Sequence, residues 1–223
     1  MKVRIDRDSL LHTIQAVSKA VATNSVVPIL AGIKIEAQDD RLVLWGNDLE
    51  MGIKCEVSAQ VDENGVVVVP GKTLLEMVKR LPETEICLET DNLNLIITYY
   101  FSEVVLSGYD PDEFPVMPEF TGSSLEIPAN LFKEMVRKTI IAAANDESRP
   151  ILHGVLLDWN DGNLGVVATD AHRLAYINTA DIPANEETFN VVVPVKAVNE
   201  ILRLIPTEGN IKLTIKNNKA LFI

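Results

Sequence analysis

The sequence of 223 residues contains only two cysteines and three histidines, and it has no run of 18 apolar residues. Cys55 and Cys87 are too few for a disulfide framework or a zinc site, which favours a reducing compartment. The scattered histidines give no metal-ligand spacing. The missing apolar run excludes a membrane span, and the strand-like residues 1–6 lack the apolar segment of a signal peptide. We therefore expect a cytoplasmic protein with no metal and no membrane partner.

Positive charge is also scarce. The chain has 20 lysines and arginines against 32 aspartates and glutamates, a formal net charge of -12. An acidic surface repels DNA, so this total excludes a generic nucleic-acid coat unless the charges are segregated. What is present is enough apolar sequence, 47% of residues, to bury a core in one large or two ordinary domains.

The chain contains two copies of one sequence unit. Residues 28–33, Pro-Ile-Leu-Ala-Gly-Ile, recur as residues 150–155, Pro-Ile-Leu-His-Gly-Val, and the same spacing pairs Asp48 with Asp170. Further along, Val-Val-Val-Pro at 67–70 matches 191–194 at a spacing only two residues longer. Such internal similarity indicates that the chain repeats one structural unit.

Apolar spacing predicts the same elements in both copies. Helical periodicity covers four windows, 6–20, 72–81, 130–145 and 195–205, and the second helix of each copy follows a proline and ends before another. Alternating runs between them predict strands at 33–37, 42–45, 53–57, 65–69, 155–158, 164–168 and 189–193. The predicted fold class is α+β, with tandem domains that each pack two helices on antiparallel sheets.

The domain boundaries follow from the alignment of the two sequence copies. We expect a first domain over residues 1–120, a linker over 121–126 and a second domain over 127–223. Nothing in the second copy matches residues 98–120 of the first, and missing last strands would leave a sheet edge open. We therefore expect the natural protein to be longer; the alternative is a natural chain with a shortened second domain.

Charge separates between helices and strands. The four helical windows hold ten basic and five acidic residues, a net charge of +5, which leaves -17 for the rest of the chain. Positive helices on an otherwise acidic protein fit contact with the DNA backbone through the helices. The alternative is that lysine and arginine are simply good helix formers.

Two motifs resemble a nucleotide-binding loop and a catalytic Asp–His pair, but each lacks residues that such a site requires. Pro-Gly-Lys-Thr at 70–73 resembles the end of a phosphate-binding loop, but Gly65 lies one residue too early for that motif. Asp170 and His172 share a strand face, yet no serine or cysteine nucleophile in a recognisable context accompanies them. Asp48, the repeat partner of Asp170, has no histidine beside it, so a structural aspartate in both copies is the better interpretation.

Five motifs resemble one known family. They are Arg7–Leu11, Pro28–Ile33, Gly46–Met51, Phe114–Pro115 and Ala168–Leu174. Together they resemble the bacterial DNA polymerase III beta subunit, the sliding clamp, and the resemblance runs along the whole chain. It implies three clamp domains per full-length chain and two chains joined head to tail in a ring around duplex DNA, held without regard to sequence. It also implies a processivity factor with no catalytic residue and no cofactor.

The resemblance further implies roles for individual residues. The residues expected to face DNA are Lys72, Lys79, Arg149, Lys196 and Arg203. The pocket expected to bind clamp-binding peptides of the DNA polymerase III alpha subunit and the clamp loader comprises Leu152, Thr169, Ala171, His172, Arg173 and Leu174. Val104 and Leu106 mark the edge expected to pair with the second clamp chain.

The sequence departs from the family at some of these places. The family often has arginine at Asn24, aromatic residues at Pro150 and Ile151, and glycine at Ala171. The first two departures concern loop contacts to DNA, and the last narrows the peptide pocket. Two other classes of function stay open: a protein-interaction scaffold that never binds DNA, and an enzyme of unknown chemistry built on a duplicated domain.

Overall fold

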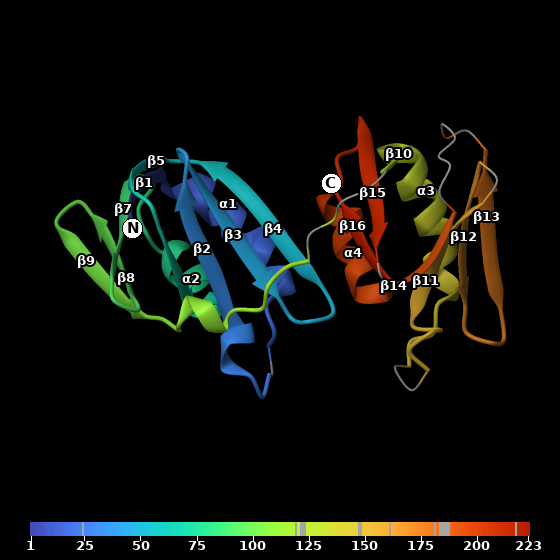
Figure 1. Ribbon diagram of the computed structural model, residues 1–223, viewed down its shortest axis with the longest axis horizontal. Helices are drawn as coiled ribbons and strands as arrows, with labels where there is room; N and C mark the ends of the chain where they lie inside the picture. Colours follow the sequence, from blue (N-terminus) through green and yellow to red (C-terminus); the bar gives the residue numbers. More distant parts are fainter. Residues whose placement is uncertain are drawn as a thin grey trace. The chain divides into compact units, whose positions relative to one another are not determined.

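The computed structural model (Figure 1) describes all residues except 24, 119, 121–123, 147–148, 161, 181, 183–187 and 217. The chain divides into two compact units, Met1–Met117 and Pro118–Ile223. Residues 121–123 of the expected linker lie outside the described part of the chain, and strand β10 already begins at Leu125.

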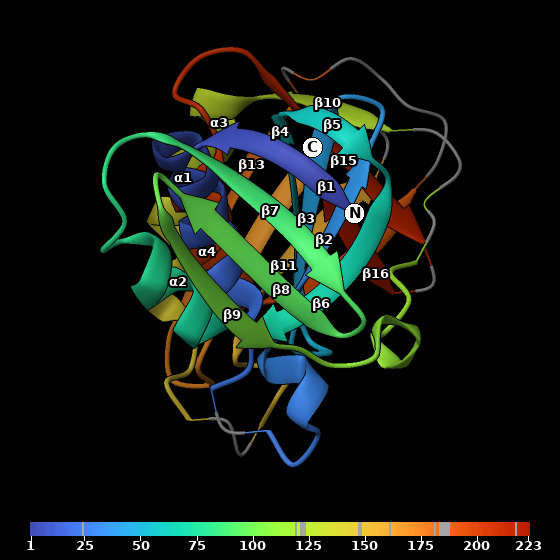
Figure 2. The same cartoon turned by 90° about the vertical axis from the view of Figure 1, so that its left-hand side faces the viewer.

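The first unit combines two helices with two sheets. Its helices are α1 (Arg7–Val17) and α2 (Gly71–Val78). Its strands are β1 (Lys2–Asp6), β2 (Gly32–Gln38), β3 (Arg41–Asn47), β4 (Gly52–Ser58), β5 (Gln60–Glu63), β6 (Gly65–Pro70), β7 (Glu85–Asp91), β8 (Asn94–Tyr99) and β9 (Ser102–Ser107). They form the sheets β5-β1-β7-β8-β9 and β4-β3-β2-β6. Figure 2 looks onto the first of these sheets.

The two halves of this unit exchange their first strands. β1 leads into α1 but pairs with β7 of the second half, while β6 leads into α2 but pairs with β2 of the first half. The helices carry matching apolar residues: Leu10 corresponds to Leu74 and Ile14 to Val78, and all four are fully buried. Because each helix is anchored at a strand of the opposite sheet, both helices and both sheets share one apolar core.

The second unit repeats this architecture. Its helices are α3 (Ala129–Thr139) and α4 (Val195–Leu204). Its strands are β10 (Leu125–Pro128), β11 (Gly154–Asn160), β12 (Asn163–Thr169), β13 (Leu174–Thr179), β14 (Phe189–Pro194), β15 (Asn210–Lys216) and β16 (Lys219–Phe222). They form the sheets β13-β12-β11-β14 and β10-β15-β16, with the same strand exchange.

These findings confirm the α+β class, the duplication and the antiparallel pairing. All strand pairings of the described residues are antiparallel. None of the helices in the described part of the chain is long and apolar enough to cross a membrane.

The structure shortens the helix expected over 72–81. α2 ends at Val78, and the next turns close through tighter bonds, with the Arg80 amide donating to the Met77 carbonyl at 2.9 Å. Proline at 82 has no N–H to donate to the Val78 carbonyl and disfavours helical backbone at Leu81, so the α-helix does not continue to residue 81. The first helix of each unit is likewise shorter than its window, and a single 3₁₀ turn follows it.

Candidate functional site

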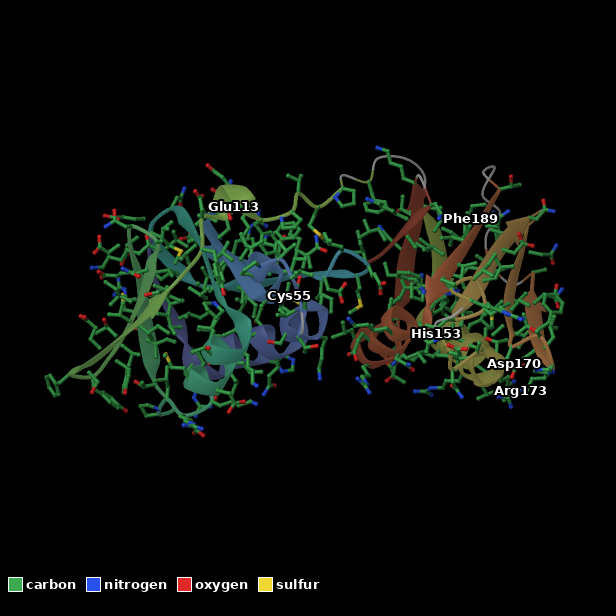
Figure 3. All side chains as sticks on the ribbon, turned by 90° about the horizontal axis from the view of Figure 1, so that it is seen from below. Cys55, Glu113, His153, Asp170, Arg173 and Phe189 are labelled. Atoms are coloured by element: carbon green, nitrogen blue, oxygen red, sulfur yellow. The ribbon has the colours of Figure 1, made fainter. Side chains whose placement is uncertain are left out.

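The turn between β12 and β13, residues Thr169–Leu174, contains most of the expected peptide pocket. We call it the Asp170 turn. One carboxylate oxygen of Asp170 accepts hydrogen bonds from the amides of His172 and Arg173 at 3.0 and 2.9 Å. The other accepts from Arg173 Nε at 3.0 Å, and Figure 3 shows these two side chains together. The amide hydrogen bonds hold the pKa of Asp170 below its ordinary value.

The first unit builds the same turn at the repeat position. The Asp48 carboxylate accepts from the amides of Glu50 and Met51 at 3.1 and 2.8 Å. Leu49 has φ 76° and its counterpart Ala171 has φ 73°, so the backbone conformation is shared. The prediction of a structural aspartate in both copies is therefore confirmed, and the Asp170–His172 motif belongs to a turn.

Replacing Asp170 by alanine is expected to loosen the Asp170 turn, because two amides and Arg173 lose their acceptor. We expect the affinity for a clamp-binding peptide to fall about tenfold, measured by calorimetry. Asp48→Ala is the matched control, with a similar loss of stability and unchanged peptide affinity. Since the pKa of Asp170 is lowered, the stabilising effect of its carboxylate is present above about pH 4 and lost as pH falls further. Equal peptide affinity in the two variants would contradict a role for this turn.

Ala171 adopts left-handed backbone, with φ 73°, which side chains with a Cβ disfavour by about 1–2 kcal/mol. Ala171→Gly removes this cost but gives the unfolded chain more freedom, worth about 0.4–1 kcal/mol in the opposite direction. We expect a net gain of about 0.5 kcal/mol in the free energy of unfolding, measured by urea denaturation. A loss of stability would contradict the strained backbone at this position.

An apolar row lies beside the Asp170 turn, on the face of the sheet that turns away from α3 and α4; its three aliphatic members are half-buried and its tyrosine is exposed. Cross-strand pairing aligns Val192, Leu156, Val167 and Tyr176 across all four strands of this sheet. Leu174 is 65% exposed and Tyr176 59%, although both are large and apolar. Leu152, from the loop before β11, is half-buried and its carbonyl accepts from the Ala144 amide at 2.9 Å.

The sequence prediction named Leu174 but missed Tyr176 and the rest of the row. The signal was present, because Leu174 and Tyr176 alternate with half-buried residues along β13 and therefore share one face. Only the strand register shows that residues from four strands meet there. A row of this kind can receive the apolar side chains of an extended peptide.

The five expected DNA-facing side chains are all exposed. Lys72 lies in the first turn of α2 and Lys196 in the first turn of α4. Arg203 lies in the last turn of α4, Lys79 caps α2, and Arg149 lies in the loop before β11. In the described part of the chain, Lys72 and Arg149 form no ion pair.

Some helix cations are paired within their own helix. Lys79 Nζ lies 2.9 Å from Glu76 Oε1, and Arg203 pairs with Glu200. The hydrogen bond and charge of Lys79 lower the pKa of Glu76. Arg7 is held between Asp8 and Glu83 with its side chain only 12% exposed, so it is a structural cation. The Lys79–Glu76 pair, by contrast, is exposed, and exposed surface pairs add little stability.

The expected dimer edge differs from the prediction in its side chains. β9 is the outermost strand of its sheet, so its backbone is open to pairing on one side. Leu106 is 7% exposed and belongs to the core, and Val104 is half-buried, whereas Val105 between them is 52% exposed. Phe101, in the turn before β9, is fully exposed. Any contact through this edge therefore uses the strand backbone, Val105 and Phe101.

Residues 1–118 match the family model described as DNA polymerase III beta subunit, N-terminal domain, and residues 126–223 match its central domain. The beta sliding clamp of Staphylococcus epidermidis is 33% identical over 233 aligned positions, which cover 100% of this chain and 62% of the relative. That of Halalkalibacterium halodurans is also 33% identical and covers 98% and 61%.

A solved structure supports the same assignment. The DNA polymerase sliding clamp from Bacillus subtilis superposes with a TM-score of 0.95 at 31% identity, covering 100% of this chain and 62% of that one. The chain thus spans about 62% of the length of such relatives. With both units matched in sequence and fold, the chain belongs to the DNA polymerase III beta subunit family, the family of the beta sliding clamps.

Proposed function

We propose that this chain forms two domains of a sliding clamp, a ring that encircles duplex DNA and keeps a replicative polymerase on its template. The observation that carries this proposal is the separation of charge: helical windows with a net charge of +5 in a chain with a net charge of -12. In this proposal the first domain covers residues 1–120, the linker 121–126 and the second domain 127–223.

The helices contact phosphates without reading bases. Lys72, Lys79, Lys196 and Arg203 are exposed side chains at helix ends, and Arg149 adds a cation from a loop. Lysine and arginine on phosphate oxygens fix position but carry no sequence information, so the ring can slide. The acidic remainder of the surface disfavours DNA elsewhere.

The second domain captures partners. The Asp170 turn and the apolar row from Val192 to Tyr176 receive a peptide of the DNA polymerase III alpha subunit or of the clamp loader. Tethering the polymerase raises its concentration near the template, which increases processivity without any chemistry by the clamp. The ring is completed by a second clamp chain, head to tail, in which the backbone of β9 pairs with the partner.

Salt dependence tests the DNA contact. At low ionic strength the chain is expected to bind duplexes of unrelated sequence with equal affinity, measured by fluorescence anisotropy. The logarithm of affinity should fall linearly with the logarithm of salt concentration, by about 0.9 for each phosphate contacted. A protein-only scaffold predicts no binding, and that result would overturn the DNA contact.

A further inference from the structure

A segment of the first unit lies across the sheet face whose counterpart in the second unit carries the apolar row. This segment, residues 108–117, is called the strap. Its Tyr109 amide donates to the Val68 carbonyl at 2.8 Å, and the two residues form an isolated β-bridge. Phe114 is 7% exposed and packs with Ile29 and Val68, both buried. In the second unit the counterpart of Ile29 is Ile151, which is 73% exposed.

The strap ends on the first unit's counterpart of the Asp170 turn. Gly52 occupies the position of Leu174, and a Cβ placed on Gly52 would lie 2.2 Å from Met117 Cε. Asn47, the counterpart of Thr169, donates from Nδ2 to Met117 Sδ at 3.5 Å. The Met117 side chain therefore lies where, in the second unit, the large apolar side chain of Leu174 stands exposed.

A buried donor next to the strap has no acceptor. The indole Nε1 of Trp45 is buried and has no hydrogen-bond partner in the described part of the chain. Trp45 packs against the cluster formed by Ile29, Val68 and Phe114. An unpaired buried donor is costly and calls for an explanation. The carbonyl of a bound peptide would supply such an acceptor.

We propose that the first unit carries a closed counterpart of the peptide-docking surface, and that the strap occupies it as an intramolecular ligand. When Met117 and Phe114 leave, the face around Gly52 and Trp45 takes an extended acidic peptide with two apolar anchors, one aromatic and one methionine. The strap itself has this chemistry, with Phe114 and Met117 three residues apart after Asp110, Asp112 and Glu113. The inference rests on the proposed peptide surface of the second unit as its template.

The strap can open without unfolding the unit. Phe114, Ile29 and Val68 form a small cluster apart from the main core of the unit. Met117 is only half-buried, and its neighbour Val116 is 93% exposed. Loss of the two strap anchors therefore leaves the residues that hold α1, α2 and both sheets together in place.

The proposal is tested by opening the strap in a variant whose second unit can no longer bind peptide. The background is Leu174→Lys, and the probe is a synthetic peptide of residues 109–117. With the strap intact we expect no binding. With Phe114→Ala and Met117→Ala added, we expect one peptide bound per chain by calorimetry, with a change in Trp45 emission. Circular dichroism checks that the opened variant is folded.

A folded, strap-opened chain that binds no peptide would overturn the proposal. Phe114→Ala alone provides a second test should the double variant not fold. Because Trp45 is half-buried and packs against the cluster that contains Phe114, this variant should increase acrylamide quenching of Trp45, whereas Trp159, only 1% exposed, does not respond. Unchanged quenching would equally overturn it. A different result would show that the proposed peptide surface of the second unit is wrong: an unchanged affinity for a clamp-binding peptide in Leu174→Lys. The two proposals therefore fail in distinguishable ways.

Discussion

Replacing Leu174 by lysine is expected to abolish binding of a clamp-binding peptide while leaving the fold intact. Leu174 is 65% exposed beside the apolar row, so its replacement removes no core contact. A docked apolar side chain would have to desolvate the new ammonium group, which costs several kcal/mol in real proteins. We expect affinity for a peptide of the polymerase alpha subunit to fall more than about 100-fold, measured by calorimetry.

The matched control for this variant is Asn178→Lys. Asn178 is exposed on the same face of β13, four residues further along, so it adds the same charge away from the turn. Its peptide affinity should change less than about twofold. Equal losses in both variants would indicate a general charge effect, and unchanged affinity in Leu174→Lys would refute the assignment of the surface.

Removing four helix-end cations is expected to weaken DNA binding for every duplex sequence alike. The variant changes to alanine Lys72, Lys79, Lys196 and Arg203. Each lost phosphate contact should make the slope of log affinity against log salt shallower by about 0.9. We expect affinity at low salt to fall at least about tenfold, because that slope reflects counterions released from DNA. Anisotropy titrations at several salt concentrations measure both quantities.

A second variant separates local contact from total charge. It changes to alanine four cations on strands, Lys2, Arg4, Arg41 and Lys212, each of which pairs with an acid. Its net charge matches that of the helix variant. If DNA binding depended only on total charge, both variants would lose the same affinity. Retained binding in the strand variant alone supports contact through the helices.

Much of the fold could be read from local pattern. The four helices and seven strands, β2, β3, β4, β6, β11, β12 and β14, follow from apolar periodicity, because one face of each element must be buried. The duplication followed from matching residues, among them Asp48 and Asp170, which indeed build the same turn. Helix ends were less predictable, since the end of α2 depends on the conformation that Pro82 imposes before it.

The candidate site was predictable as a motif but not as a surface. The residues from Thr169 to Leu174 are adjacent in sequence, so their resemblance to a family could be recognised directly. The apolar row could not, because Val192, Leu156, Val167 and Tyr176 come from four strands whose register is fixed by hydrogen bonds between them. The orientation of Val104 and Leu106 was likewise decided by packing into the core.

The α+β class, the two copies, the charge of the helices and the family all follow from residue identity and spacing along the chain. Which of the equivalent surfaces is open depends instead on tertiary packing. The strap covers one sheet face through Phe114 and Met117, while the same face of the other unit leaves Leu174 and Tyr176 exposed. The reason is physical: burial of a side chain depends on which distant segment packs over it, and local pattern does not encode that contact.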